Sequence, residues 1–422
     1  MTAADTLRLA SNILVIKFGF VGMKDKMAKL IEITGKALSG EWGNDDNTGN
    51  GIPVLRTTNF TNEGIVNYNN VVTRIIEKKK IEEKYLRKGD IIIEKSGGSD
   101  KQPVGRVVYF DGPENTYLFN NFTGLLRVKD QAKWYPRYVF YSLFSNYHRG
   151  GTRAFQNKTT GLHNLKIDDF VSRCEVTEAG INEQIAACKR MDRVNDIIRM
   201  HQQQLQKLDE LVKARFVELF GGIHNSNKYP YKPIQELTDV ISGGTPNRDV
   251  NEYWECGTIP WVKTTELQNN LIKEVDEYIT EKGLNSSSAK LVPPGTVLIA
   301  MYGQGKTRGM TAYLNIEACT NQACACILPS DQINQTFLWK FLILSYDNLR
   351  GMAKGGNQPN LNGIIIKNYP ILYPPIELQE QFAAFVEQTD KSKYYSSLSF
   401  RYCQAAENTY RQEWMTCRTS DF

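Results

Sequence analysis

The chain contains the same ordered set of sequence blocks twice, and this repeat limits the possible folds more than any other feature. The run IPVLRTTNF at 52–60 returns 207 residues later as IPWVKTTEL at 259–267. Three further pairs follow in the same order, with offsets of 206, 199 and 197 residues: 88–93 with 294–299, 161–165 with 360–364, and 182–187 with 379–384. Chance similarity would not preserve both order and spacing, so the sequence predicts a tandem duplication.

Each copy reads as a β-rich part followed by a helix. Apolar runs of strand length, entered through glycine, occupy 86–94 and 292–301. From 181 to 219, apolar residues recur at alternating steps of three and four, which predicts one long helix. At 1.5 Å per residue it would be roughly 58 Å long, too long to be buried inside one domain, and Gly221 and Gly222 would end it. The predicted class is therefore α+β.

The second copy should have an equivalent helix that starts at Ile376. Its apolar pattern is clear through Phe382 and decays after Val386. At the offset of 197, the seam residues of the first helix, Met191, Val194 and Val212, correspond to Gln388, Lys391 and Thr409. We therefore expect a shorter or poorly packed helix at this end. The expected organisation is an N-terminal extension (1–26), a first domain (27–178), a central helix (179–221), a second domain (222–375) and a C-terminal helix with an atypical tail (376–422).

Composition excludes some classes of protein and decides little else. With 51 Lys plus Arg against 46 Asp plus Glu, the net charge of +5 permits a polyanionic partner without requiring one. No run approaches the roughly 20 apolar residues of a membrane span, and the most apolar stretch, 13–21, contains Lys17. The eight cysteines lack the density of a disulfide-stapled secreted domain, which favours a cytoplasmic protein.

The chain resembles the DNA specificity subunit of type I restriction-modification systems from about residue 27 to about residue 393. The motifs that carry the resemblance are SGGTP at 242–246 with IPW at 259–261, PPGTVL at 293–298, NQPNL at 357–361, PPIELQEQ at 374–381, and the central helix at 206–221. The decayed last helix departs from the pattern of the family.

The resemblance implies a subunit without chemistry of its own and without a cofactor. Two target-recognition domains would each read half of a bipartite site in double-stranded DNA. The long helices would pair as an antiparallel coiled coil, set the spacing and dock two methyltransferase subunits, and restriction subunits would then join. The complex would have adenine DNA methyltransferase and ATP-dependent endonuclease activity. The residues themselves agree on one point, since two similar domains separated by a long helix suit two separate half-sites.

The segment 300–307 satisfies a loosened phosphate-loop spacing, with Ala300 in place of the first glycine. A phosphate loop must be followed at once by a helix, but residues 308–314 contain Gly309 and lead toward a strand. We therefore expect a mobile glycine-rich loop that contacts DNA, and a solvated loop without a ligand remains the alternative.

Cys319, Cys324 and Cys326 lie close together like metal ligands, but their spacing is wrong for a zinc ribbon or finger. On a strand, Cys324 and Cys326 would share one face and behave as small buried hydrophobes. The four histidines indicate neither a catalytic triad nor a metal site.

The candidate DNA contacts come from loops next to the repeated blocks. Amide side chains suit adenine edges, whereas Lys and Arg suit phosphate or guanine. The candidates are Arg56, Lys95, Ser96, Arg106, Asn157, Lys158, Thr159, Lys263, Gln304, Lys306, Arg308, Asn357 and Gln358. Turn chemistry explains Asn and Gly in such loops equally well.

Two other classes of function are alternatives. One is a methyltransferase or nuclease that reads its own target. This sequence contains no Asn-Pro-Pro-Tyr-like run, so base methylation has no apparent site. A coiled-coil adaptor with two β-rich binding domains for protein or glycan is compatible with the composition, and salt-dependent DNA binding would distinguish it from a DNA reader.

Overall fold

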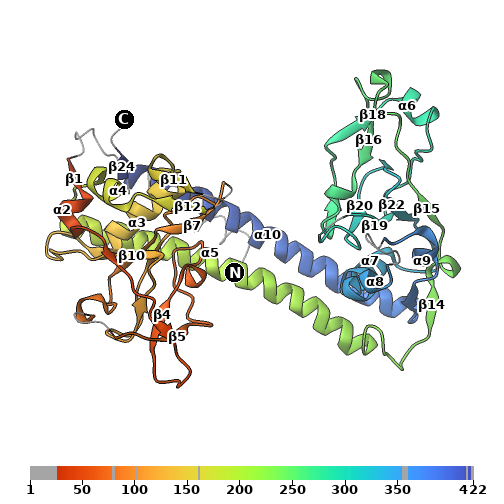
Figure 1. The fold of residues 1–422 in the computed structure, drawn as a ribbon. Coiled ribbons are helices and arrows are strands. Elements are labelled where there is room, and N and C mark those ends of the chain that lie inside the picture. The colour runs from red at the N-terminus through yellow and green to blue at the C-terminus, as the bar shows by residue number, and fades with distance from the viewer. Residues whose placement is uncertain are drawn as a thin grey trace. The chain divides into compact units, whose positions relative to one another are not determined.

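The computed structural model describes residues 26–77, 81–100, 102–159, 162–303, 305–353, 360–414 and 417–419 (Figure 1). The predicted N-terminal extension therefore lies outside the described residues except for Lys26. The chain forms two compact units. It passes from unit 1 to unit 2 between Gln202 and Gln203, and it returns to unit 1 between Ser396 and Ser397. Each unit contains one β-rich region and parts of both long helices, α5 (Ile181–Phe220) and α10 (Ile376–Trp414).

Unit 1 holds the first copy. Its strands are β1 (Met27–Lys29), β2 (Leu38–Ser39), β3 (Asn44–Asp45), β4 (Ile52–Leu55), β5 (Val72–Ile75), β6 (Ile91–Glu94), β7 (Ser96–Gly98), β8 (Val107–Tyr109), β9 (Leu118–Phe119), β10 (Thr123–Leu126), β11 (Gln156–Thr159), β12 (Leu162–Leu165), β13 (Cys174–Thr177) and β24 (Cys417–Thr419). Its helices are α2 (Leu30–Thr34), α3 (Pro136–His148) and α4 (Ile167–Arg173), with short 3-10 turns η1 (Thr57–Asn59), η2 (Glu82–Lys84) and η3 (Arg153–Phe155).

Unit 2 holds the second copy. Its strands are β14 (Tyr231–Pro233), β15 (Val240–Ser242), β16 (Ile259–Val262), β17 (Asn270–Ile272), β18 (Glu277–Ile279), β19 (Val297–Ala300), β20 (Thr311–Leu314), β21 (Cys319–Thr320), β22 (Cys324–Ile327) and β23 (Pro370–Leu372). Its helices are α6 (Glu281–Asn285), α7 (Gln335–Leu344), α8 (Tyr346–Gly351) and α9 (Gly363–Lys367), with 3-10 turns η4 (Ile234–Glu236), η5 (Asn251–Tyr253) and η6 (Thr264–Glu266).

The two copies share their sheet topology. The central sheet has the order β2-β10-β6-β8 in unit 1 and β15-β22-β19-β20-β17 in unit 2, so β6 and β19 are equivalent strands. A second sheet is built on β4 in one unit and on β16 in the other. Each of these strands has one antiparallel neighbour, β5 or β18, and one parallel neighbour, β9 or β21. The predicted duplication is therefore present in the hydrogen-bonded strands as well as in the sequence.

Each central sheet separates two apolar cores, because successive side chains of a strand point to opposite faces. In β19, Val297 and Ile299 face the core formed with α7 and the long helices, whereas Leu298 faces the core on the other side. In β6, Ile91 and Ile93 face the helical side, and Ile92 faces the second sheet.

The tight turn into each central strand uses a glycine in the left-handed region. Gly89 has φ of 98° before β6, and Gly295 has φ of 89° before β19. Other residues rarely adopt this conformation, so the glycine that marks the start of each repeated strand is required by the backbone.

Within unit 2, the end of α5 packs against the start of α10. The rings of Phe216 and Phe382 lie 5.5 Å apart between centroids, and Arg215 lies over the ring of Phe385 at 5.8 Å. Further along, Asp209 of α5 pairs with Lys393 of α10. Because residue numbers fall along α5 as they rise along α10, the two helices run antiparallel here. The predicted α+β fold, with two β-rich domains and long helices that pack together, is confirmed.

The expectation of a shorter or poorly packed C-terminal helix was wrong. The helix α10 has 39 residues and α5 has 40. The two helices begin at Ile181 and Ile376, an offset of 195, so the earlier offset of 197 was two residues out of register. At 195, the buried Met191 corresponds to the buried Val386.

The buried face of α10 continues beyond Val386 with small side chains. These buried residues are Thr389, Ser396, Ser399 and Cys403. The hydroxyl of Thr389 donates to the carbonyl of Phe385 at 2.9 Å, so its own helix satisfies it. A hydrophobicity pattern misses such a face, because small polar residues can be buried when their hydrogen bonds are met locally.

None of the helices that the structure describes combines the length and the apolar character needed to cross a membrane.

Candidate nucleic-acid interface

In unit 1, a small sheet brings together candidate residues that are about 60 residues apart in the sequence. The strand β7 begins the loop that follows β6, and it pairs with β12, which in turn pairs with β11. Asn157 of β11 lies opposite Asn164 of β12, and Ser96 of β7 donates its hydroxyl hydrogen to Oδ1 of Asn164. Asn157 is exposed. The arrangement presents hydroxyl and amide groups beside each other, which suits hydrogen bonding to base edges.

Basic candidates lie next to this sheet. Lys95 precedes β7, and its Nζ donates to Ser39 Oγ at 3.2 Å. Partial burial lowers the pKa of Lys95. Lys158 and Thr159 belong to β11, but their side chains lie outside the described residues.

Arg106, at the end of the same loop, forms bonds within its own domain. Its guanidinium binds both carboxylate oxygens of Glu94 at 3.2 Å and donates to the carbonyls of Thr57 and Phe60 at 3.1 and 3.2 Å. These contacts tie the central sheet to η1. The geometry favours a bracing role for Arg106, and its contact with DNA remains a prediction.

Arg56 and Lys263 occupy equivalent positions, as the repeat indicates. Each precedes a 3-10 turn, and its backbone N–H donates to the side chain three residues later, Asn59 at 3.0 Å or Glu266 at 3.3 Å. The Arg56 side chain donates to the carbonyl of Asn70 at 3.1 Å.

Lys263 makes a comparable contact through charge. Its Nζ lies 3.0 Å from Glu277 and 3.4 Å from Asp276, and the hydrogen bond to Glu277 is the main reason that its pKa is raised. Two neighbouring carboxylates would disfavour an approaching phosphate. A phosphate contact by Lys263 is untested and stays a prediction.

In unit 2, hydrogen bonds from α8 hold the loop after β19. Arg350 donates to the carbonyls of Arg308 at 2.7 Å and Gly305 at 2.8 Å, and Tyr346 donates to the carbonyl of Lys306 at 2.6 Å. The Lys306 side chain is exposed. The loop leads into strand β20 and not into a helix, so it lacks the helix N-terminus that a phosphate loop requires. The loop is glycine-rich as expected, but α8 anchors its backbone, whereas a mobile loop was expected, and its contact with DNA stays a prediction.

Three candidates of the second copy, Gln304, Asn357 and Gln358, lie outside the described residues. The segment that follows them is placed next to the glycine-rich loop, because the N–H of Leu361 donates to the carbonyl of Met301 at 3.0 Å. In the first copy, the N–H of Leu165 makes the same contact with the carbonyl of Lys95 at 2.8 Å. In both copies a backbone hydrogen bond therefore joins the segment that begins after the central strand to the segment that contains Leu165 or Leu361.

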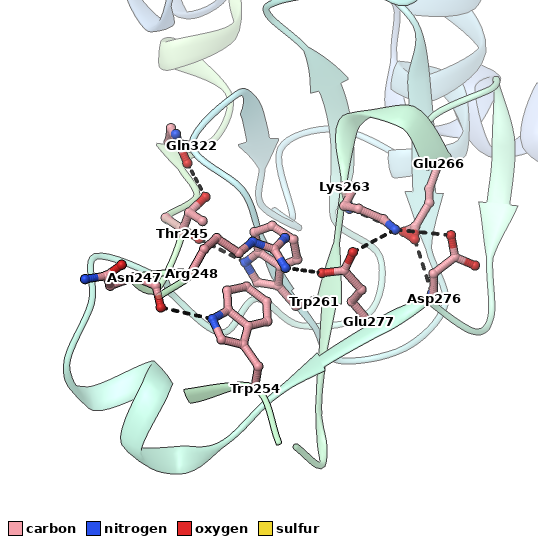
Figure 2. A network of polar contacts seen from close by, with 11 residues as sticks. Thr245, Asn247, Arg248, Trp254, Trp261, Lys263, Glu266, Asp276, Glu277 and Gln322 are labelled. Atoms are coloured by element: carbon pink, nitrogen blue, oxygen red, sulfur yellow. Dashed lines mark hydrogen bonds and ion pairs between the residues drawn. The ribbon is translucent and has the colours of Figure 1, made fainter. Parts of the chain in front are cut away.

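A cluster that the sequence reasoning missed surrounds Arg248 in unit 2 (Figure 2). The guanidinium lies 3.7 Å from the ring centroid of Trp254 and 4.7 Å from that of Trp261, and it binds Glu277 at 2.6 Å. Glu277 also binds Lys263, so one carboxylate joins both cations (Figure 2). The signal that could have revealed this cluster is Trp261 itself, which stands in the repeated block where the first copy has Val54.

Both tryptophan side chains are anchored by their indole N–H groups. Trp261 donates to the carbonyl of Gly244 at 3.0 Å, and Trp254 donates to the carbonyl of Asn247 at 3.1 Å. The hydroxyl of Thr245 is also hydrogen-bonded to the side chain of Gln322 (Figure 2).

The three clustered cysteines are buried in unit 2. Cys324 and Cys326 share the core beneath the central sheet, as expected for one face of a strand, whereas Cys319 packs in a separate cluster with Trp261. Burial raises the pKa of Cys319 and of Cys326 to about 11. Among the described residues, no group of His, Cys, Asp and Glu is arranged to hold a metal ion. In unit 1, Cys174 is disulfide-bonded, which the cysteine spacing did not indicate.

Comparison with known proteins yields related sequences. A 163-residue segment is 25% identical to the specificity subunit of the type I restriction enzyme EcoR124I/EcoR124II of Escherichia coli, covering 38% of this chain and 40% of the relative. A 165-residue segment is 30% identical to the specificity subunit of the type I restriction enzyme MjaIX of Methanocaldococcus jannaschii, covering 38% and 37%. These matches span about two fifths of each relative.

The fold matches over nearly the whole chain. The crystal structure of the type I restriction-modification system S subunit from M. genitalium superposes with a TM-score of 0.59 at 15% identity, covering 96% of this chain and 99% of that one. The family profile described as type I restriction modification DNA specificity domain matches residues 25–210 and 227–394, most of both copies. The chain therefore belongs to the family of type I restriction-modification DNA specificity domains.

Proposed function

We propose that this chain is the non-catalytic DNA specificity subunit of a type I restriction-modification complex, in which each unit reads one half of a bipartite site in double-stranded DNA. The observation that carries the proposal is the duplicated reading surface. In both units a backbone hydrogen bond joins the segment after the central strand to a second segment, from Leu165 to Lys95 in unit 1 and from Leu361 to Met301 in unit 2. Two equivalent surfaces on one chain suit two separate half-sites.

The proposal assigns direct readout to side chains of the small sheet such as Ser96 and Asn157, and a phosphate contact to Lys306 of the loop. Arg106 and Lys263 are bonded within their domains and brace these surfaces, and their own contacts with DNA stay predictions. The long helices α5 and α10 set the distance between the half-sites and dock two methyltransferase subunits, and restriction subunits join that complex. A cytoplasmic location goes with this proposal, since the substrate is cellular DNA.

The principal experiment is co-expression of the chain with its methyltransferase subunits, followed by mapping of methylated bases in the host genome. The expected result is one bipartite sequence. Replacing residues 27–178 by the equivalent segment of another family member should then change only one half of that sequence. A change in both halves, or methylation without a sequence preference, would contradict independent reading by the two units.

A second experiment tests whether the loop contacts phosphate. The Lys306→Ala variant should bind duplex DNA more weakly, and its slope of log affinity against log salt should fall by about 0.9 for the lost phosphate contact. The control is Lys207→Ala, which removes an exposed lysine from α5. Equal slopes for Lys306→Ala and the unmodified chain would rule out a phosphate contact by Lys306.

A further inference from the structure

A tyrosine at the same position in each copy holds the loop that follows the central strand. Tyr147 lies in the last turn of α3 and donates its hydroxyl hydrogen to the carbonyl of Pro103 at 3.0 Å. Tyr346 begins α8 and donates to the carbonyl of Lys306 at 2.6 Å. Their offset of 199 is the offset between the starts of α3 and α7, so the two tyrosines are equivalent.

The loops that they hold are also equivalent. The first joins β6 to β8 and the second joins β19 to β20. Each has a left-handed glycine two residues before its second strand, Gly105 with φ of 108° and Gly309 with φ of 85°. A side chain at Gly105 would collide with Thr152, and one at Gly309 would press on Arg350. Each loop therefore lies against the segment that follows α3 in unit 1 or α7 in unit 2.

We call the hydrogen bond from Tyr147 or Tyr346 to its loop the clasp. In the second copy, a cation adds to the clasp. Arg350 binds the carbonyls of Arg308 and Gly305 and also donates to the hydroxyl of Tyr346 at 3.0 Å. The donors thus hold three carbonyls of a short glycine-rich segment. Glycine-rich backbone has many accessible conformations, and each bond to a fixed helix removes some of them.

We propose that Tyr147 and Tyr346 are positioning residues, each of which holds the reading loop of its own unit in the conformation that discriminates one half-site. The inference rests on the proposed function, because it requires these loops to read DNA. Neither hydroxyl needs to touch DNA. Each acts by keeping loop side chains, such as the exposed Lys306 in unit 2, in place before DNA arrives, so that binding does not have to order the loop.

The test uses the full chain with its methyltransferase subunits and three duplexes. One duplex carries the sequence mapped for the wild-type complex, and each of the others has one half scrambled. Tyr147→Phe should lower discrimination at the half read by unit 1 about fivefold, the equivalent of one ordinary hydrogen bond, and leave the other half unchanged. Tyr346→Phe should have the converse effect.

Matched controls are available in each unit. Tyr138, on the same helix as Tyr147, donates to the carbonyl of Thr177 at 3.2 Å, and Tyr369 donates to the side chain of Asn348 at 2.9 Å. Tyr138→Phe and Tyr369→Phe remove a hydroxyl bond that does not involve the loop. They should change the melting temperature as much as the clasp variants do, while both half-sites are still discriminated as in the wild type.

Amide hydrogen exchange on the purified full chain provides a second measurement that does not depend on activity. Tyr147→Phe should speed exchange in the loop 95–106 and Tyr346→Phe in 301–310, each without affecting the other loop. Equal loss at both half-sites, or no loss with unchanged exchange, would overturn the inference while leaving the proposed function in place. A wild-type complex that discriminates neither half would instead overturn the proposed function, and the inference with it.

Discussion

The buried side chains of Gln184 and Gln379 make the same contacts in the two copies. Oε1 of Gln184 accepts from the backbone N–H of Tyr135 at 2.8 Å, and Oε1 of Gln379 accepts from that of Asn334 at 2.9 Å. Each Nε2 donates at 2.8 Å to the carbonyl five residues earlier, that of Ala179 or Pro374. Each glutamine thus joins the first turn of a long helix to the residue that precedes α3 or α7.

Replacing Gln379 by Ala should destabilise unit 2 by about 2 kcal/mol, because the N–H of Asn334 and the carbonyl of Pro374 lose their partner in a buried place. Urea unfolding monitored by tryptophan fluorescence would measure the change. Gln381, two residues further on, is exposed, so Gln381→Ala serves as the control and should leave the midpoint nearly unchanged. Equal shifts for the two variants would show that Gln381 occupies the equivalent position after all.

An ion pair between a buried lysine and a partly exposed aspartate joins α7 to α10. Nζ of Lys340, which is 8% exposed as a residue, lies 3.0 Å from Oδ2 of Asp390. Asp390→Ala should destabilise the protein by about 3 kcal/mol, because it leaves the ammonium group buried without a partner. The double variant Lys340→Met with Asp390→Leu should recover most of that loss. The exposed pair Glu387–Lys391 on the same helix is the control, and Glu387→Ala should cost little. If the double variant is no more stable than Asp390→Ala, packing and not charge accounts for the loss.

Stability should depend on pH through Lys340. Burial lowers its pKa from 10.5, and Asp390 offsets only part of that effect. Below the lowered pKa the full cost of the buried charge is present. Between that pKa and 10.5, the folded chain binds fewer protons than the unfolded chain, so this group makes folding more favourable as pH rises. The unfolding free energy of the wild type relative to Lys340→Met should therefore increase from pH 8 toward pH 10. A constant difference would mean that the lysine titrates as in the unfolded chain.

Among the described free cysteines, only Cys256 is exposed, whereas Cys188, Cys319, Cys324, Cys326 and Cys403 are buried. Burial also raises the pKa of Cys319 and of Cys326 to about 11, which suppresses the reactive thiolate. A maleimide should therefore label Cys256 rapidly in the native protein, and Cys256→Ser should abolish that rapid labelling. Peptide mapping by mass spectrometry would identify the labelled residue, and rapid labelling of Cys324 would contradict the buried placement.

The spacing between the half-sites should follow the length of the long helices. Inserting four residues after Gln203 in α5 and four after Ser396 in α10 lengthens both helices by about 6 Å while nearly keeping their register. The gap in the methylated sequence should widen by about two base pairs, and both half-sequences should stay the same. Two-residue insertions, which rotate the rest of each helix by about 200°, are the control and should abolish assembly. An unchanged gap in an active four-residue variant would exclude the helices as the ruler.

An alignment of the two copies could have paired the tyrosines of the clasp and the two glutamines, but no residue pattern indicated the contacts that they make. Tyr147 and Tyr346 share the offset of 199 that one repeated block also has, so extending the alignment would have paired them. Their importance could not be read from a pattern, because a tyrosine at the end of an apolar helix is usually a core residue. The register of α10 was misjudged for a related reason, since small buried residues such as Ser396 and Ser399 do not stand out as a hydrophobic stripe.

The sequence by itself determined the duplication, the long central helix, the glycine entry to each central strand and the absence of a helix after residue 307. These are local or periodic properties, which backbone geometry and the spacing of side chains decide over short stretches. Only the tertiary structure decided which charged side chains are bonded within their domain, as Arg106 is to Glu94, and which are exposed, as Lys306 is. The physical reason is that these partners are brought together by strand pairing and helix packing across the fold, and the strength of a charged contact depends on the burial and the neighbouring charges found there.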